Sequence, residues 1–279
     1  MRGRKFSQVD VFTHIPYKGN PVAVVLDGEG LSDAEMQSFA NWTNLSETTF
    51  VLPPSDPAAD YRVRIFTPKA ELPFAGHPTL GTAHAVLEAG IASAKAGKLV
   101  QQCAVGLVEL TLAGGALSFR LPRYAVNDAP GGDEATAWIG GAALKGPAKA
   151  VDVGPVWLIV ELAEINALET LQHDPARLTA YYEQYGLTGA TLFAAQDDRV
   201  VVRSFAPGDG IPEDPVCGSG NGAVAAYRLT LGQIGDGSAY RASQGRQLGR
   251  DGWIDIRIEG KDIHVGGACV TCVRGEVQL

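Results

Sequence analysis

The sequence predicts an α+β protein with two similarly folded halves, each with a β-sheet around a central helix. Three observations predict this fold. Short β-branched runs recur along the 279 residues while helical patterns are few and scattered, which disfavours the regular alternation of a doubly wound sheet. Two helical stretches are small or apolar around most of their circumference, as in a helix surrounded by protein. The third observation is an internal repeat spaced by about half the chain.

The expected strands are bounded by Gly, Pro, Asp or Asn. They are QVDVF, PVAVVL, TTFVL, YRVRIF, GLVELTL, VWLIVEL, ATLFAA, RVVVRSF and WIDIRI. Ser32 is the predicted N-cap of the helical segment DAEMQSFANWT, and a helix after Asp174 is expected to end at Gly186. The two apolar helices are expected to start near Pro78 and near Gly220.

The internal repeat relates RIFTPKAELPFAGHPTLGTAHAVLEAG (64–90) to RSFAPGDGIPEDPVCGSGNGAVAAYRLTLG (203–232). Each copy has an Arg-x-Phe-x-Pro pattern, then a glycine-containing loop, then a helix. The copies share three further positions, namely Glu71/Glu213, Pro73/Pro215 and Gly76/Gly218. We therefore expect two domains, 1–121 completed by a C-terminal strand at about 270–279, and 122–269, with the boundary in PRYAVNDAPGGDE.

Composition and charge exclude several classes of protein. A net charge of −8 and a pI near 5.1 disfavour a nucleic-acid partner, which needs clustered Lys and Arg. No apolar stretch of signal-peptide or membrane-spanning length is present, so we expect a cytoplasmic protein with no membrane partner. The four cysteines do not form a disulfide framework, and Cys269 and Cys272 are expected as buried strand thiols rather than a metal or redox pair.

The two helix starts point to an anion site. The first N–H groups of a helix have no partner within the helix, and the peptide dipoles add positive charge there. If the halves face one another, both starts meet in one cleft and can hold a small carboxylate-bearing substrate. His77 from one half and Asp214, Cys217 and Ser219 from the other would lie in that cleft. Imidazole, carboxylate and thiol groups suit proton transfer near neutral pH, which requires no cofactor and no metal.

Four segments in this order give a resemblance to a known family. VDVFTHIPYKGNPVAVVLDG, NLSETTFVLPP, RIFTPKAELPFAGHPTLGTAHAV and EDPVCGSGNGA together resemble the phenazine-biosynthesis PhzF-like family, in the diaminopimelate epimerase superfamily. The resemblance extends over nearly the whole chain. It implies two pseudo-symmetric domains, each a mixed or antiparallel sheet rolled into a barrel around a helix, with a site in the cleft between them. It also implies homodimers and cofactor-independent isomerisation.

The resemblance implies a role for individual residues. It places the acid/base glutamate on Glu47, and further catalytic residues on His77 and Asp214. The predicted substrate-binding residues are Gly76, Cys217, Gly218, Ser219 and Gly220. Relatives that epimerise amino acids use one cysteine from each half, whereas this chain has Ala75 opposite Cys217. A proton shift by Glu47 is therefore favoured over racemisation by two thiols.

The residues alone leave structural alternatives open. Glu47 can be a solvated loop carboxylate, and His77 can simply cap its loop. Asp214 precedes a proline and can be a turn residue, while Ser219 can be an N-cap that also binds ligand. Cys217 is either a reactive thiol at a helix start or a small buried residue.

Two other functions compete with isomerisation. A thiol-dependent hydrolase or acyl-transfer enzyme would use Cys217 as nucleophile and His77 as base. A non-catalytic small-molecule-binding protein would keep the fold and the cleft without the chemistry. A dinucleotide site is disfavoured because the glycines at 218, 220 and 222 do not follow a strand immediately.

Overall fold

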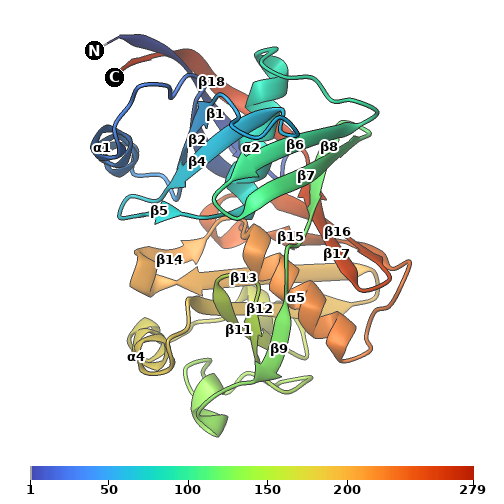
Figure 1. Cartoon of the computed structure of the whole chain (residues 1–279). Coiled ribbons are helices and arrows are strands. Elements are labelled where there is room, and N and C mark those ends of the chain that lie inside the picture. The colour runs from blue at the N-terminus through green and yellow to red at the C-terminus, as the bar shows by residue number, and fades with distance from the viewer. Residues whose placement is uncertain (1) are drawn as a thin grey trace. The chain divides into compact units, whose positions relative to one another are not determined.

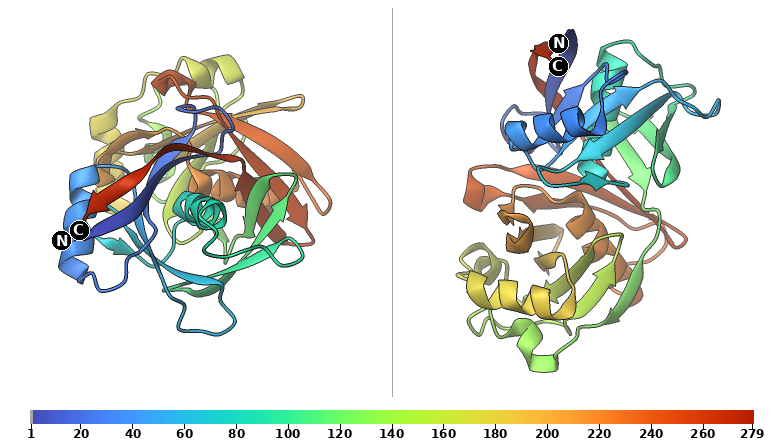
Figure 2. Two further views of the ribbon diagram at one scale, coloured as in Figure 1. Left: turned by 90° about the horizontal axis from the view of Figure 1, so that it is seen from above. Right: turned by 60° about the vertical axis from the view of Figure 1, so that its left-hand side comes forward.

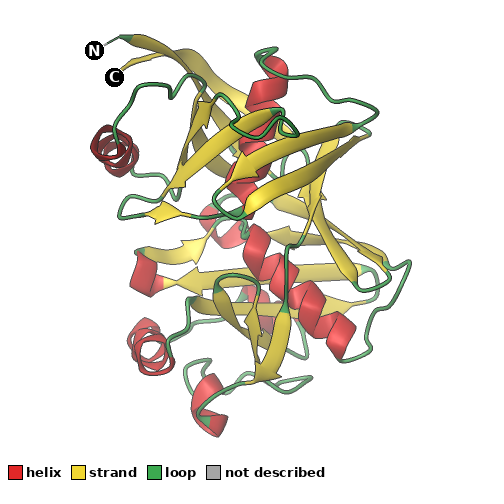
Figure 3. Cartoon of the chain, viewed as in Figure 1, coloured by secondary structure: helices red, strands yellow, loops and turns green. Residues whose placement is uncertain are grey.

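The computed structural model describes residues 2–279 and divides the chain into two compact units. Of the described residues, unit 1 comprises 2–119 and Gly266–Leu279, and unit 2 comprises Arg120–Val265 (Figure 1). Strands predominate and helices are few, as expected for an α+β protein (Figure 3). The sequence predicts two domains, 1–121 completed by about 270–279, and 122–269. That these domains fold independently stays a prediction.

Among its described residues, unit 1 contains two helices and nine strands. The helices are α1 (Asp33–Thr43) and α2 (Gly76–Glu88). The strands are β1 (Gly3–Val11), β2 (Asn20–Val25), β3 (Thr48–Leu52), β4 (Tyr61–Phe66), β5 (Glu71–Leu72), β6 (Lys98–Cys103), β7 (Gly106–Ala113), β8 (Ala116–Arg120) and β18 (Cys269–Gln278). The hydrogen-bonded order is β18-β1-β2-β3-β4-β6-β7-β8, with β2–β3 and β4–β6 parallel and the other pairs antiparallel. The short β5 pairs antiparallel with the end of β4.

Unit 2 contains three α-helices, α3 (Ile165–Glu169), α4 (Pro175–Tyr185) and α5 (Gly218–Thr230). Its strands are β9 (Ala125–Asp128), β10 (Lys149–Asp152), β11 (Val156–Glu161), β12 (Gly189–Gln196), β13 (Arg199–Ala206), β14 (Ile211–Asp214), β15 (Ala239–Gln244), β16 (Gly252–Glu259) and β17 (Asp262–Gly267). Short 3₁₀ turns lie at Gly132–Thr136, Pro207–Asp209 and Arg246–Leu248. The order β9-β10-β11-β12-β13-β15-β16, with β11–β12 and β13–β15 parallel, repeats the pairing directions from β18 to β7 in unit 1.

In each unit, one mostly buried helix packs against several strands of the sheet. Helix α2 packs against β1, β2, β3, β6 and β18, and α5 packs against β9, β10, β11, β12 and β16. Figure 2 shows α2 end-on with strands of unit 1 around it. Both helices are buried along most of their length, which explains why their sequences are apolar on every side. A Cβ at Gly81 of α2 would lie within 2.4 Å of Val22 Cγ1, so helix and sheet approach too closely for a larger residue. Closure of either sheet into a barrel stays a prediction.

The expected local structure is present. All nine predicted runs overlap strands, although Phe12, Leu26 and Leu162 lie just past the ends of theirs. Ser32 caps α1 in a capping box with Glu35. Asp174 caps α4, which ends at Gly186 with a φ of 66°. The two apolar helices begin at Gly76 and Gly218, two residues before the expected starts.

The repeated Arg-x-Phe and Glu positions form the same contact in both units. Arg64 donates two hydrogen bonds to Glu71, each 2.7 Å long, and Arg203 donates two to Glu213, each 2.9 Å long. Each arginine also lies 5.1 Å from the ring centre of the phenylalanine two residues later. The residues shared by the two copies therefore form the same contact between two neighbouring strands, an arginine–glutamate ion pair with two hydrogen bonds, called the arginine–glutamate clamp below.

The four cysteines are free thiols, and Cys269 and Cys272 lie partly buried in β18. No group of His, Cys, Asp or Glu among the described residues is arranged to hold a metal ion. Across residues 2–279, no helix has both the length and the apolar character needed to cross a membrane.

Candidate functional site

Glu47 lies in unit 1, at the entrance to β3. Helix α1 ends at Asn44, whose positive φ of 53° turns the chain back toward the sheet. The Glu47 carbonyl accepts a hydrogen bond from Ala23 N on β2 at 3.4 Å, which holds the residue against the neighbouring strand. Its side chain is 14% exposed, and Oε2 lies 3.5 Å from His77 Nε2. Glu47 is therefore not a solvated loop carboxylate.

His77 is the second residue of α2 and is 7% exposed. Burial lowers its pKa to about 4, opposed by a hydrogen bond to the backbone of Pro21, so the imidazole is neutral at pH 7. Because Nε2 makes no hydrogen bond, the nitrogen that donates to the Pro21 carbonyl is Nδ1. Nε2 then presents a lone pair to the Glu47 carboxyl group. This arrangement favours a proton, or a proton-bearing group of a ligand, between the two side chains.

The start of α5 in unit 2 is capped by a thiol. Cys217 is the N-cap, and its Sγ accepts a hydrogen bond from Gly220 N at 3.2 Å. The N-cap alternative for Ser219 is therefore wrong, because Ser219 lies inside the first turn. Burial raises the pKa of the Cys217 thiol well above its ordinary value, despite the helix start. A protonated, buried thiol weighs against Cys217 as the nucleophile of a hydrolase.

Ser219 has a fixed hydrogen-bond donor beside it. Trp157 on β11 donates from Nε1 to Ser219 Oγ at 3.1 Å. The serine oxygen therefore already accepts one hydrogen bond and keeps its own proton to donate. Ser219 Oγ also lies 3.5 Å from Cys217 Sγ.

Asp214 lies at the end of β14. Its Oδ1 accepts a hydrogen bond from Val216 N at 2.9 Å, so it does form the turn expected around Pro215. Burial nevertheless raises its pKa to about 6, with hydrogen bonds from Val216 and Cys217 opposing the shift. The structural and the chemical interpretations of this residue are therefore compatible.

The two helix starts are equivalent residue by residue. Gly76 and Gly218 are the first residues of α2 and α5, and His77 and Ser219 are the second. Gly76 faces Phe119, whose Cζ would lie 2.8 Å from an added Cβ. The repeat thus presents a histidine in one unit where it presents a serine in the other.

The predicted site residues fall into two groups. Glu47, Gly76 and His77 lie together in unit 1. The second group lies together in unit 2 and comprises Asp214, Cys217, Gly218, Ser219 and Gly220. The thiol hydrolase would need Cys217 and His77 together, and that pairing of residues from different units stays a prediction.

The sequence interpretation missed the side chains that support the second group. Gln244 accepts from Cys217 N at 3.2 Å and from Asn221 Nδ2 at 2.9 Å, and donates to the Asp214 carbonyl at 2.9 Å. Trp157, which orients Ser219, was assigned only to a strand. The available signal was a polar residue inside an apolar segment, such as Asn221 in GNGAVAAY.

Comparison with protein families decides the assignment. The model of the family described as "Phenazine biosynthesis-like protein" matches residues 9–275. The chain belongs to this family. Among curated relatives, Antisense-enhancing sequence 1 of Schizosaccharomyces pombe is 38% identical over 297 residues, covering 99% of both chains. The trans-2,3-dihydro-3-hydroxyanthranilate isomerase of Pseudomonas chlororaphis is 34% identical, covering 97% of this chain and 98% of the relative.

Solved structures agree with the family. A Bacillus anthracis phenazine biosynthesis protein of the PhzF family matches with a TM-score of 0.87 at 25% identity, covering 100% of both chains. A hydroxyproline epimerase from Agrobacterium vitis shares the fold alone, with a TM-score of 0.69 at 15% identity over 99% of this chain and 92% of the epimerase. With several curated members of the family named isomerases, the chain is an enzyme of the isomerase class.

Proposed function

We propose that the protein is a cofactor-independent isomerase that moves a proton on a small carboxylate-bearing metabolite, with Glu47 as the acid/base residue. The observation that carries the proposal is the Glu47–His77 pair, in which a largely buried carboxyl oxygen lies 3.5 Å from a neutral imidazole nitrogen. A carboxyl group held beside a neutral imidazole is positioned to accept a proton and to return it.

In the proposed reaction, the Glu47 carboxylate removes a proton from one carbon of the substrate. The electron pair of the broken C–H bond shifts into the conjugated system that the substrate carboxylate extends. The protonated Glu47 then returns the proton to a different carbon, so that the product is an isomer and no electrons are gained or lost. His77, neutral and fixed by Pro21, holds the carboxyl group of Glu47 in place between the two steps.

The proposal assigns the substrate carboxylate to the start of α5. Free N–H groups of the first turn and the Ser219 hydroxyl are suitable donors, because Trp157 leaves the serine proton available. Asp214, with a pKa of about 6, supplies a second group that can exchange a proton near neutral pH. The proposal therefore has residues of both units act on one substrate, in a cleft between the two halves. A cytoplasmic location and a homodimer also stay predictions.

The test measures exchange of substrate hydrogen with solvent. Trans-2,3-dihydro-3-hydroxyanthranilate, the substrate in the name of the P. chlororaphis relative, is the first compound to test, followed by a panel of small unsaturated carboxylates. Each is incubated with the protein in deuterated water, and isomerisation and deuterium content are followed by NMR.

Glu47→Gln keeps the size of the side chain and removes the base. Loss of a general base costs about 10²- to 10⁴-fold in rate, and calorimetric binding of the same compound is expected to persist. Glu29→Gln, at an exposed position outside the site, is the matched control. Isomerisation by Glu47→Gln at the rate of the Glu29→Gln control would overturn the assignment of the base.

A further inference from the structure

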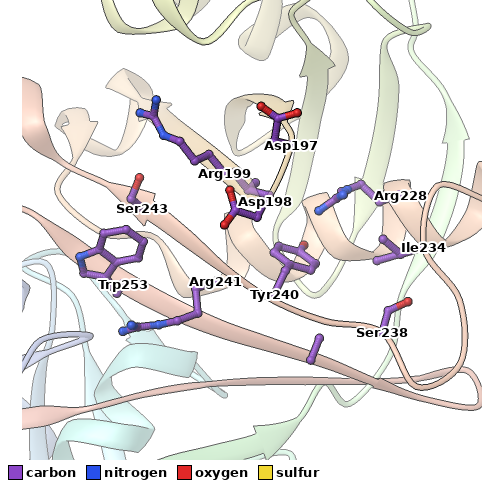
Figure 4. Close-up of a pocket in the computed structure, with 12 residues that line it drawn as sticks. Asp197, Asp198, Arg199, Arg228, Ile234, Ser238, Tyr240, Arg241, Ser243 and Trp253 are labelled. Carbon is purple, nitrogen blue, oxygen red and sulfur yellow. The ribbon is translucent and has the colours of Figure 1, made fainter.

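A pocket of about 630 Å³ opens in unit 2, between the β12–β13 turn, the end of α5, and strands β15 and β16 (Figure 4). None of the residues proposed for isomerisation lines it. Its walls carry three arginines (Arg199, Arg228, Arg241), two aspartates (Asp197, Asp198) and two aromatic side chains (Tyr240, Trp253).

Arg228, in the last turn of α5, has an unsatisfied positive charge. Its Nε and Nη1 are buried and make no hydrogen bond. Within the described part of the chain, no carboxylate oxygen lies within 4.0 Å of its guanidinium group, which instead lies 4.5 Å from the ring centre of Tyr240. A cation that is partly removed from water without a counter-ion is costly, so an anion that reaches it is favoured.

The other two arginines of the pocket already have acidic partners. Arg241 donates to Asp255 at 2.9 Å and lies 5.0 Å from the Trp253 ring centre. Arg199 lies 4.0 Å from Glu169. Arg228 is therefore the arginine of this pocket whose charge is left for a ligand.

Tyr240 supplies a hydrogen-bond donor beside Arg228. The side chains of Arg228 and Tyr240 lie together at one end of the pocket in Figure 4. The Tyr240 hydroxyl is buried and makes no well-formed hydrogen bond. Burial raises the pKa of Tyr240 to about 12, so the hydroxyl keeps its proton at neutral pH and can donate it.

The aspartates limit the charge of the ligand. Asp197 and Asp198 form the two-residue turn between β12 and β13, where Gln196 pairs with Arg199, and both line the pocket. Their negative charge repels a dianion more than a monoanion. Ile234 and the Tyr240 ring offer apolar surface for the rest of a ligand.

We propose that this pocket is a second ligand site, which binds a small monocarboxylate with an aromatic or apolar body through Arg228 and Tyr240. Binding here does not depend on the isomerase proposal, because the two sets of residues do not overlap. The carboxylate neutralises the Arg228 guanidinium and accepts a hydrogen bond from the Tyr240 hydroxyl, while the body of the ligand packs on the apolar surface of Ile234 and the Tyr240 ring.

The test uses benzoate as the probe, with benzamide and inorganic phosphate as neutral and dianionic comparisons, measured by calorimetry and by the shift in Tm. Arg228→Gln is expected to weaken benzoate binding at least tenfold. Arg241→Gln removes an arginine of the same pocket that already has a partner, and is expected to change binding less than threefold. Ser219→Ala is expected to leave this binding intact, which separates the pocket from the start of α5.

Tyr240→Phe provides a second variant that keeps the ring and the guanidinium and removes one donor, with an expected several-fold loss. Because the partly buried Arg228 guanidinium has no carboxylate partner, Arg228→Gln is expected to fold with an unchanged or higher Tm in the absence of benzoate. Equal benzoate affinity in wild type and Arg228→Gln would overturn the proposal. Phosphate or benzamide binding as tightly as benzoate would overturn the assignment to a monocarboxylate.

Discussion

The two copies of the arginine–glutamate clamp allow a matched test of how burial sets the strength of an ion pair. In unit 2, Arg203 and Glu213 are 6% and 10% exposed, and two 2.9 Å hydrogen bonds join them. Arg203 also donates to the carbonyls of Leu168 and Leu171 at 3.1 and 3.0 Å. Removing the glutamate leaves a buried cation that the protein cannot expose.

In unit 1, Arg64 and Glu71 are 23% and 38% exposed, and Arg64 has a second partner in Asp33 at 2.6 Å. Breaking a buried pair by removing one partner costs about 3–5 kcal/mol, whereas an exposed pair contributes about 0–1 kcal/mol. We therefore expect Glu213→Ala to lower the free energy of unfolding by about 3–5 kcal/mol, and Glu71→Ala by less than about 1 kcal/mol.

Urea denaturation followed by far-UV circular dichroism measures both variants, with m-values compared to confirm that the same surface unfolds. The double variant Arg203→Met/Glu213→Leu is expected to recover most of the loss, because it removes the stranded charge. A Glu213→Ala variant no less stable than Glu71→Ala would refute the argument from burial. Since Glu213 directly precedes Asp214, its removal is also expected to lower activity.

Three further predictions concern the helix starts. Since the pKa of Asp214 is raised to about 6, the folded state binds its proton more tightly than the unfolded state, and this residue makes stability fall as pH rises from about 4 to 6. The pKa of His77 is lowered to about 4, so this residue makes the free energy of unfolding rise from about pH 4 to 6.5. In urea titrations, Asp214→Asn should steepen the rise of this free energy with pH, and His77→Asn should remove the rise. Gly220→Ala would place a Cβ 2.5 Å from Thr191 Oγ1 and 2.8 Å from Ser204 Oγ. It is expected to lower the free energy of unfolding by about 1–3 kcal/mol, measured by thermal or urea unfolding. Gly235→Ala, whose Cβ would enter open space, is expected to change it little. With its thiol protonated and buried, Cys217 should react with iodoacetamide at pH 7.5 far more slowly in the folded protein than in urea, and peptide mass spectrometry showing equal rates would contradict this.

Local sequence patterns predicted the elements whose signals are strong. Ser32 with Glu35, and Asp174 with Gly186, mark the helix ends because caps act through hydrogen bonds within one turn. The strands that were not singled out include β6 (KLVQQC), where burial alternates along the strand but polarity does not, and Gln101 is completely buried. Gln101 is stabilised by hydrogen bonds to Tyr61 and Thr79, a partnership that no local pattern reveals.

The candidate site was also predictable only in part, because its contacts join residues that are far apart in the sequence. The equivalence of Gly76 with Gly218 followed from aligning the two copies, and the helices start at those residues. The Glu47–His77 contact joins residues 30 positions apart, and Glu47 was identified only through the family resemblance. The neutral imidazole and the protonated thiol arise from burial, which depends on the packed structure rather than on the neighbouring letters.

The central claim is that the equivalent starts of α2 and α5 act on one carboxylate substrate, with Glu47 as the base. A crystal structure with a slowly reacting substrate analogue tests it most directly. The account predicts that the ligand carboxylate accepts hydrogen bonds from the first turn of α5 and Ser219, while the carbon that loses its proton lies next to the Glu47 carboxyl group. An analogue that competes with substrate but contacts only one of the two units would contradict it.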